Sequence, residues 1–207
     1  ISYTGSVAAL AALADRVGGR RQGRRPLGPA YLRTDIPTAL RAALATEPGV
    51  EALARTLAGR RRVWLVGGGP GAVVASEIAL KIKETSYLQA EGLSVEAMLH
   101  GPFQCVDPED LFVLIAQEGP SAGRVAELAA QVRTIGAGLL VVGDDTARRI
   151  DDAACLVPHV PEPFAGLTCA VPLQLFAYHL ALVRGTNPDG FRLDDPRFAR
   201  AYKQATL

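Results

Sequence analysis

Several features are scarce in this 207-residue sequence, and each scarcity narrows the possible classes of protein. There are three cysteines, Cys105, Cys155 and Cys169, with no Cys-x-x-Cys pair among them. Each lies in or near an apolar run, so we expect buried free thiols in a reducing compartment. Cys155 and His159 alone cannot complete a tetrahedral zinc site, and no metal is expected.

An excess of charge of one sign is also missing. The sequence has 22 Lys and Arg against 21 Asp and Glu, a net charge of +1, which favours neither a nucleic-acid partner nor a membrane surface. The local exception is RRQGRR at 20–25, which we interpret as a solvated loop. No uninterrupted apolar run reaches the roughly 18 residues of a membrane span. No signal peptide is evident, and cytoplasm is the expected compartment.

The beginning of the sequence is unusual. It starts ISYTGSVAALAALADRVGG, without an initiator methionine and already in a helical pattern, which we interpret as a piece of a longer polypeptide. Hydrophobic residues make up 49 % of the chain, enough for a sizeable core. The length suits one domain with an additional arm.

Helical and strand-like segments alternate over most of the chain. Unbroken apolar runs separated by helices indicate a parallel sheet covered on both faces, so the predicted fold class is α/β, a three-layer αβα sandwich. We expect Ser121 to cap one helix and Gly136 to end it. The expected strands are 63–68, 111–116, 138–145 and 154–160. The expected helices are 6–17, ended by Gly18-Gly19, two within 37–58, broken near Pro48-Gly49, and then 72–89, 121–136, 168–184 and a short one at the end of a polar tail. Residues 19–30 are expected to be an exposed connector.

A glycine-rich turn follows the first expected strand. Gly67, Gly69 and Ala72 satisfy the dinucleotide-binding pattern GxGxxG/A in a loose form. That pattern also requires an acidic residue at the end of the next strand, which here ends at 115–117 in Ile-Ala-Gln, and no GK[ST] follows the turn. We therefore interpret it as a sharp turn that needs glycine, and expect no cofactor. A nucleotide-binding oxidoreductase is the weaker alternative and would bind nicotinamide or flavin.

The helix expected at 72–89 carries two stripes. Its apolar positions at 74, 78 and 82 recur every four residues and predict a buried face. Glu77, Lys81 and Glu84 recur at i, i+4 and i+7 and predict a second, charged face. Taken alone, the charged stripe is typical of an ion-pair ladder on a protein surface.

Two longer segments carry a family resemblance. The segment ALKIKETSYLQAEGLSVEAMLHGPFQCVD (79–107) resembles the second sugar-isomerase (SIS) domain of glucosamine-6-phosphate synthases and related phosphosugar isomerases and deaminases. The segment VPLQLFAYHLALVRGTNPD (171–189) is similar to the last helix of that domain. The resemblance implies a SIS domain over 36–207. It also implies that 1–35 is a helical arm and linker from a preceding SIS half.

The resemblance also implies an activity: aldose–ketose or amino-sugar isomerisation of a hexose or hexosamine 6-phosphate, without a cofactor. Glu84 aligns with the carboxylate that moves a proton between C1 and C2 of the open-chain sugar, and Lys81 with a lysine near the reacting oxygens. His100 aligns with a histidine that opens the sugar ring from across a subunit interface, which implies a homodimer. Lys203 falls near the family's C-terminal lysine, although the tail here is longer.

The sequence departs from the family pattern at several positions. Leu99 and Gln89 stand where the synthases have a lysine and a histidine, and no Ser/Thr-rich phosphate loop of the SxSxxT kind is present. The alternative function is therefore a non-catalytic SIS module that binds a sugar phosphate and regulates another process. His159 and His179 are expected to be packed or half-exposed residues outside the site.

Overall fold

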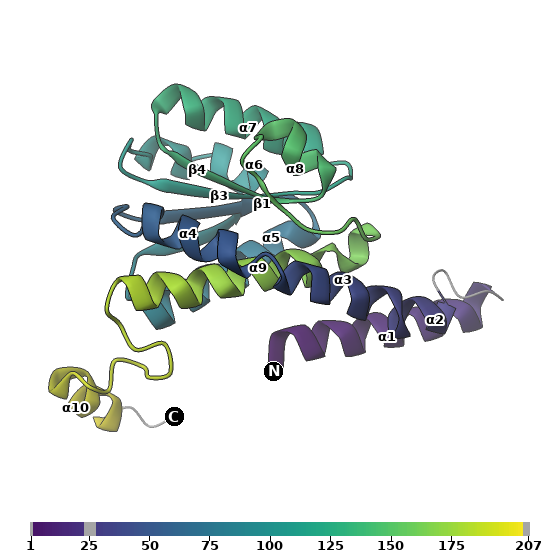
Figure 1. Ribbon diagram of the computed structural model, residues 1–207, viewed down its shortest axis with the longest axis horizontal. Coiled ribbons are helices and arrows are strands. Elements are labelled where there is room, and N and C mark those ends of the chain that lie inside the picture. The colour runs from purple at the N-terminus through teal and green to yellow at the C-terminus, as the bar shows by residue number, and fades with distance from the viewer. Residues whose placement is uncertain (1, 23–27, 205–207) are drawn as a thin grey trace.

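The computed structural model, which describes residues 2–22 and 28–204, has a five-stranded parallel sheet at its centre (Figure 1). The strand order is β2-β1-β3-β4-β5, with every neighbouring pair parallel. This confirms the α/β class and the parallel sheet. The strands are β1 (Val63–Gly67), β2 (Ala90–Ser94), β3 (Leu111–Ala116), β4 (Gly138–Gly143) and β5 (Cys155–Leu156).

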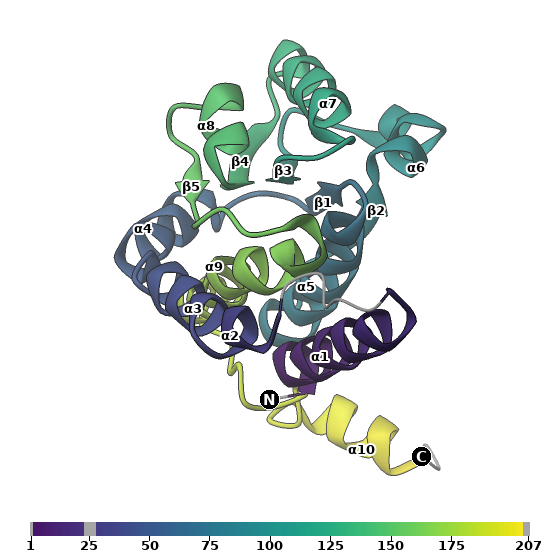
Figure 2. The same ribbon diagram turned by 90° about the vertical axis from the view of Figure 1, so that its right-hand side faces the viewer.

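Helices cover both faces of the sheet, as Figure 2 shows edge-on, so the three-layer sandwich is also confirmed. All residues of β1 and β3 are buried, because each strand presents alternate side chains to the two helical layers. One layer holds α3 (Asp35–Leu44), α4 (Glu47–Leu57), α5 (Pro70–Ser86) and α9 (Glu162–Val183); the other holds α6 (Val95–Leu99), a 3-10 turn (Pro102–Cys105), α7 (Ala122–Ile135) and α8 (Asp145–Ile150).

Three further helices lie outside the sandwich (Figure 1). The long helix α1 (Ser2–Gln22) contacts α9, and α2 (Gly28–Arg33) leads into α3. A small apolar cluster around Ile36, Phe164 and Leu167 joins this region to the start of α9. The C-terminal helix α10 (Pro196–Gln204) confirms the expected short helix in the polar tail.

Helix α9 is the most apolar helix of the structure. By length and composition it could cross a membrane, with a mean hydropathy of 1.5 over an 18-residue window. However, 72 % of that window is buried, and fifteen of the helix's residues are buried against α3, α4 and α5. Helix α9 is therefore a core helix of this fold.

Several predicted boundaries are wrong for identifiable reasons. The break expected at Pro48-Gly49 falls at 45–46, and Pro48 lies in the first turn of α4, where its missing N–H removes no helical hydrogen bond. Gly18-Gly19 does not end α1, and α9 begins at Glu162 rather than 168. The strand expected at 154–160 is limited to 155–156. The connector expected at 19–30 is helical at 19–22 and 28–30, and its centre lies outside the described residues. Of RRQGRR, interpreted as a loop, residues 20–22 belong to α1 and 23–25 lie outside the described residues.

Local details of caps and cysteines also differ in part from expectation. Ser121 has helical backbone angles and makes no side-chain cap, whereas Gly136 ends α7 in the left-handed conformation, as predicted. Cys169 is buried and Cys155 is partly buried, but Cys105 is exposed, which corrects its prediction as a buried thiol. Burial raises the pKa of the Cys169 thiol, so this group remains protonated.

Strand β2 was not predicted, because AEGLS lacks the β-branched and aromatic residues typical of strands. Its place at the edge of the sheet depends on Gly92. A Cβ at Gly92 would lie 2.4 Å from both the Ala75 carbonyl oxygen and the Ser76 Cα, so α5 packs directly on the strand backbone. Gly67 meets the start of α5 in the same way, with the Gly71 backbone 2.6 Å from a hypothetical Cβ.

We expect Gly92→Ala to lower the free energy of unfolding by about 3 kcal/mol or more, because the methyl group would force α5 away from β2. Gly123→Ala is the matched control: it lies in α7 with nothing within 4 Å of the added carbon, and it should be neutral or stabilising by about 0.5–1 kcal/mol. Urea unfolding of both variants measures the difference. Equal stability of the two variants would contradict the tight contact.

Candidate active site

Helix α5 places the three charged residues of the predicted ladder on one partly exposed ridge. Its opposite face is anchored by Val74, Ile78 and Ile82, all with 0 % exposure, as the periodicity predicted. On the ridge, Lys81 Nζ donates a 2.8 Å hydrogen bond to Glu84 Oε2 and lies 3.8 Å from Glu77 Oε1. The Glu84 side chain is 28 % exposed, so the carboxylate is partly shielded and still accessible.

The hydrogen bond between Lys81 and Glu84 dominates the electrostatics of this ridge. It raises the pKa of Lys81 above its ordinary value, against an opposing effect of burial, and the charges of Glu84 and Glu77 add to the increase. Lys81 is therefore an ammonium at any physiological pH. The arrangement joins a potential proton acceptor to a fixed positive charge.

The end of α5 is fixed by polar contacts with the segment after α9. Thr186 Oγ1 donates a 2.6 Å hydrogen bond to the Thr85 carbonyl, and the Arg184 Nε donates one of 3.3 Å to the Ser86 carbonyl. These bonds satisfy carbonyls that the last turn of a helix leaves without partners. As a result, Glu84 sits on a well-defined helix end rather than on a frayed one.

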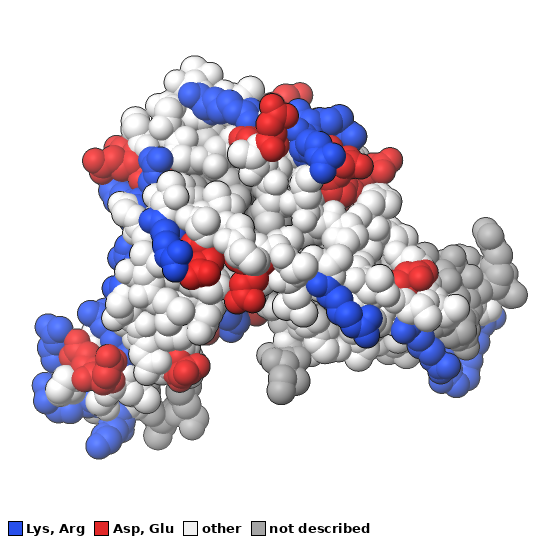
Figure 3. Space-filling view, viewed as in Figure 1, with Lys and Arg blue, Asp and Glu red and all other residues white. Residues whose placement is uncertain are grey.

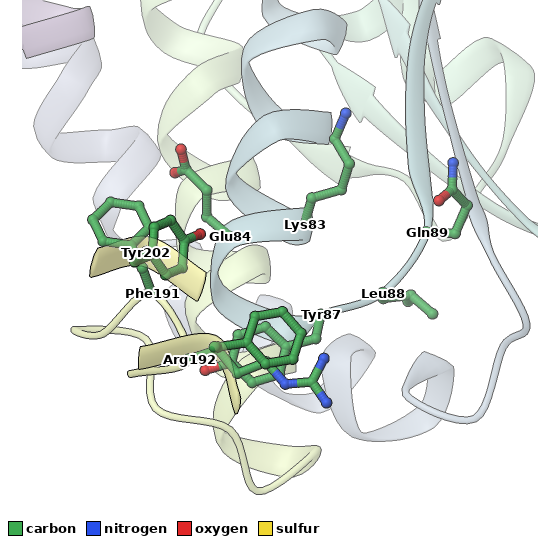
Figure 4. A pocket seen from close by; sticks show the side chains of 9 residues that line it. Lys83, Glu84, Tyr87, Leu88, Gln89, Phe191, Arg192 and Tyr202 are labelled. Atoms are coloured by element: carbon green, nitrogen blue, oxygen red, sulfur yellow. The ribbon is translucent and has the colours of Figure 1, made fainter. Parts of the chain in front are cut away.

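Glu84 lines a cavity of about 330 Å³ between the end of α5 and the C-terminal region (Figure 4). This volume is in the range of small-molecule sites. Figure 4 shows Glu84 and Lys83 leaving α5 in different directions, with Tyr202 of α10 on the Glu84 side. The lining residues are Lys83, Glu84, Tyr87, Leu88, Gln89, Phe191, Arg192, Phe198 and Tyr202.

A second cavity, of about 380 Å³, lies on the other side of the ridge. Glu77, Lys81 and Thr85 contribute from α5, and Tyr3 and Thr4 from α1. Burial raises the pKa of the Tyr3 hydroxyl, with a smaller contribution from the negative charge of Glu77. The hydrogen-bonded pair Lys81–Glu84 therefore separates two hollows, with one partner in each.

His100 is not brought to Glu84 within this chain. It follows α6 on the opposite helical layer, its side chain is 79 % exposed, and its Nε2 lies 3.7 Å from Glu96 Oε2. Glu96 is held in turn by Arg124, whose hydrogen bonds are the main cause of the lowered pKa of this carboxyl. His100 thus faces outward from an ion-paired surface.

Lys203 lies on α10 and is exposed. It is not among the residues that line the Glu84 cavity, although its neighbour Tyr202 is. The other two histidines have the burial that the sequence predicted. His159 is 56 % exposed, and His179 is nearly buried with its Nε2 3.1 Å from Glu47 Oε1.

The glycine-rich turn is filled by protein. A Cβ at Gly68 would lie 2.1 Å from Ser121 Cβ, and Gly69 has a φ of +49°, so both positions require glycine for packing or backbone reasons. The space between this turn and residues 117–121 measures about 10 Å³, and the Glu162 carboxylate approaches Gly69. This geometry favours the interpretation as a structural turn over that of a pyrophosphate site.

A cluster that the sequence did not predict lies at the carboxyl ends of β3, β4 and β5. Glu118, Asp144 and His159 each present a potential metal-ligand atom within 4.8 Å of the others. Asp144 already accepts hydrogen bonds from the Thr146 and Glu118 amides, at 2.9 and 3.1 Å, and lies 2.8 Å from His159 Nδ1. Its role is therefore to cap α8 and to tie three loops together. The run GDD after a strand was the available signal.

We expect Asp144→Ala to lower the free energy of unfolding by about 2 kcal/mol near pH 7, because two amides and His159 lose their acceptor. Burial alone would raise the pKa of Asp144, but the hydrogen bonds from His159 and the two amides outweigh it, so the pKa lies below 3.8. The ionised group thus stabilises the fold above pH 3.8, and this contribution is lost as pH falls through the folded pKa.

The measurement is urea unfolding of wild type and Asp144→Ala across the acid range. Asp145→Ala is the control, because this neighbouring side chain is 81 % exposed and should change stability by less than about 0.5 kcal/mol. A difference between wild type and Asp144→Ala that grows as the solution is acidified would contradict the assignment.

Comparisons with known proteins agree with this fold. The family model described as "SIS domain" matches residues 56–184, more than half of the chain. A glutamine–fructose-6-phosphate aminotransferase (isomerizing) of Zymomonas mobilis is 32 % identical over 195 residues, covering 91 % of this chain and 32 % of the relative. One from Synechocystis sp. is 37 % identical over 143 residues, covering 68 % and 23 %. The chain thus spans between about a quarter and a third of the length of such relatives.

Solved structures share the fold at lower sequence identity. The C-terminal domain of glucosamine-fructose-6-phosphate aminotransferase from Francisella tularensis has a TM-score of 0.68 and 24 % identity, covering 77 % of this chain and 45 % of that one. Glucosamine-6-phosphate deaminase from Thermotoga maritima has a TM-score of 0.71 and 19 % identity, covering 91 % and 54 %.

Proposed function

The chain belongs to the SIS-domain family, and from this we propose that it is the half of a phosphosugar isomerase that carries the proton-transferring carboxylate. The proposed substrate is a hexose or hexosamine 6-phosphate, and the reaction is aldose–ketose or amino-sugar isomerisation. The observation that carries the proposal is the Glu84 carboxylate in the wall of a 330 Å³ cavity, 2.8 Å from the Lys81 ammonium. Relatives named as isomerizing aminotransferases support the substrate class.

In the proposed mechanism, Glu84 removes a proton from one of the two carbons C1 and C2 of the opened sugar and returns it to the other. The electron pair left behind forms an enediolate, with the negative charge on the former carbonyl oxygen. The hydroxyl proton of the neighbouring oxygen passes to that oxygen, so the carbonyl re-forms at the other carbon as the former carbonyl carbon is protonated. The Lys81 ammonium, 2.8 Å from Glu84, stabilises the negative charge of the enediolate. The proton moves within the substrate, so the step needs no external oxidant or reductant.

Two further residues are proposed to complete the site. His100 would open the sugar ring in the site of a second copy, which suits an exposed side chain on the opposite layer from Glu84. This makes a homodimer part of the proposal. Lys203 would approach the substrate carbonyl from α10, whose residues Phe198 and Tyr202 line the cavity.

A non-catalytic sugar-phosphate-binding module is the second candidate. The observation that favours it is the separation of Glu84 from His100 within one chain, since binding requires only the cavity, whereas catalysis requires both groups. Measuring turnover distinguishes the two functions.

We expect Glu84→Gln, in the full-length protein, to reduce turnover of hexose 6-phosphates by a factor of about 10² to 10⁴, because the amide cannot accept the proton. The isosteric change should leave substrate binding and the unfolding temperature close to wild type. Glu109→Gln is the control, an exposed carboxylate at the amino end of β3. Turnover equal to wild type in Glu84→Gln would exclude the enzyme in favour of the binding module.

Mixing two inactive variants tests the shared site. If His100 acts in the site of the partner, a mixed dimer of Glu84→Gln and His100→Ala has one site with both groups intact. Random exchange of subunits should then recover about a quarter of wild-type turnover, since half of the dimers are mixed and each has one working site. No recovery after verified subunit exchange would place both groups in the same chain's site or remove His100 from catalysis.

A further inference from the structure

Arg192 occupies an unusual position in the wall of the Glu84 cavity. Its guanidinium carbon lies 5.0 Å from the centre of the Tyr87 ring and 4.2 Å from the centre of the Phe198 ring, and Figure 4 shows it beside Tyr87. A guanidinium that packs on ring faces is held by them while its N–H edges stay available. The two rings therefore fix the group without using its hydrogen-bond donors.

The hydrogen-bond donors of the Arg192 side chain have few acceptors in the described part of the chain. Among residues 2–22 and 28–204 the side chain makes no hydrogen bond, and the one carboxylate within 4.0 Å is Asp195, at 3.9 Å. Asp195 itself binds Arg197, which donates hydrogen bonds of 2.8 and 3.1 Å to it. Arg192 thus presents a fork of donors suited to a phosphate or carboxylate.

Backbone strain coincides with this arrangement. In the described part of the chain, Tyr87 and Arg192 are the two non-glycine residues with positive φ, at +53° and +57°. Such conformations persist only where the surroundings enforce them, and they cluster at ligand sites. The Tyr87 hydroxyl is also buried without a hydrogen-bond partner among these residues. The same two residues therefore carry the strain, the ring contact and an unsatisfied polar atom.

Charge distinguishes the two cavities on either side of the ridge. The Glu84 cavity is lined by two cations, Lys83 and Arg192, against one carboxylate. The cavity on the Lys81 side has two carboxylates, Glu77 and Asp189, against one cation. Although Figure 3 shows both signs of charge mixed over α10, the hollow that α10 helps to form has a positive lining. An anionic group is favoured on the Arg192 side.

We propose that Arg192 binds the phosphate group of the substrate, with the sugar carbons extending from it toward Glu84. This inference rests on the proposed function and assigns an anion-binding residue within this chain, which has no SxSxxT loop. The Tyr87 and Phe198 rings hold the guanidinium in place, and Lys83 adds positive charge to the cavity.

The test measures binding of inorganic phosphate, and its competition with a hexose 6-phosphate, to the full-length protein by calorimetry. Arg192→Gln should weaken phosphate binding roughly ten- to hundredfold, because a charge-assisted hydrogen bond is lost. Arg192→Lys should restore part of the affinity, since the charge returns without the fork. Arg200→Gln is the control, because this exposed cation on α10 is not among the residues that line the cavity, and the variant should bind phosphate as wild type does.

Phe198→Leu separates anion binding from mere anchoring of α10, because it loosens the ring contact and keeps the charge. If Arg192 only anchors the helix, Phe198→Leu and Arg192→Gln will weaken a phosphorylated and an unphosphorylated hexose equally. Either that result, or wild-type phosphate affinity in Arg192→Gln, would overturn the proposal. Failure of the Glu84 proposal is distinguishable, because phosphate binding does not require turnover.

Discussion

The position of α5 is the constraint on which the rest of the structure depends. At four glycines, α5 packs so closely on a neighbouring element that an added side chain would be crowded or excluded. Gly67 of β1 meets the Gly71 backbone, Gly71 packs on Ile115 of β3, Gly92 brings β2 against the helix, and Gly166 of α9 lies against Val74. Contact at van der Waals distance on three sides removes the freedom of α5 to shift or rotate. The charged ridge with Glu84 is therefore placed by this close packing of α5, not by its own ion pairs.

Sequence periodicity predicted what depends on neighbours along the chain. The spacing of Glu77, Lys81 and Glu84 was enough to place them on one helix face, and the limits of β3 agree with its apolar run. The strand β2 was missed because its stability comes from the close approach of α5 and not from strand-forming residues. Propensity carries no information about such an approach.

The residues that line the cavities could not be predicted from the sequence, for a different reason. Tyr87 and Arg192 are separated by more than a hundred positions, and nothing in either local pattern indicates that a tail residue will pack on the ring. Asp144 and His159 are close in the sequence, but their contact depends on β4 and β5 lying side by side in the sheet. Long-range pairs of polar and aromatic residues are specified by topology, which short motifs do not encode.

The left-handed conformation of Tyr87 has a consequence for how this protein could change. Helices that end in this conformation usually have glycine at that position, and here a tyrosine bears a penalty of about 1 kcal/mol or more. Replacement by glycine would relax the helix end but delete the aromatic surface on which the C-terminal tail rests. Selection for thermal stability alone would therefore favour glycine and remove the contact that holds the C-terminal tail. Tyr87 thus links the stability of the helix end to the shape of the Glu84 cavity.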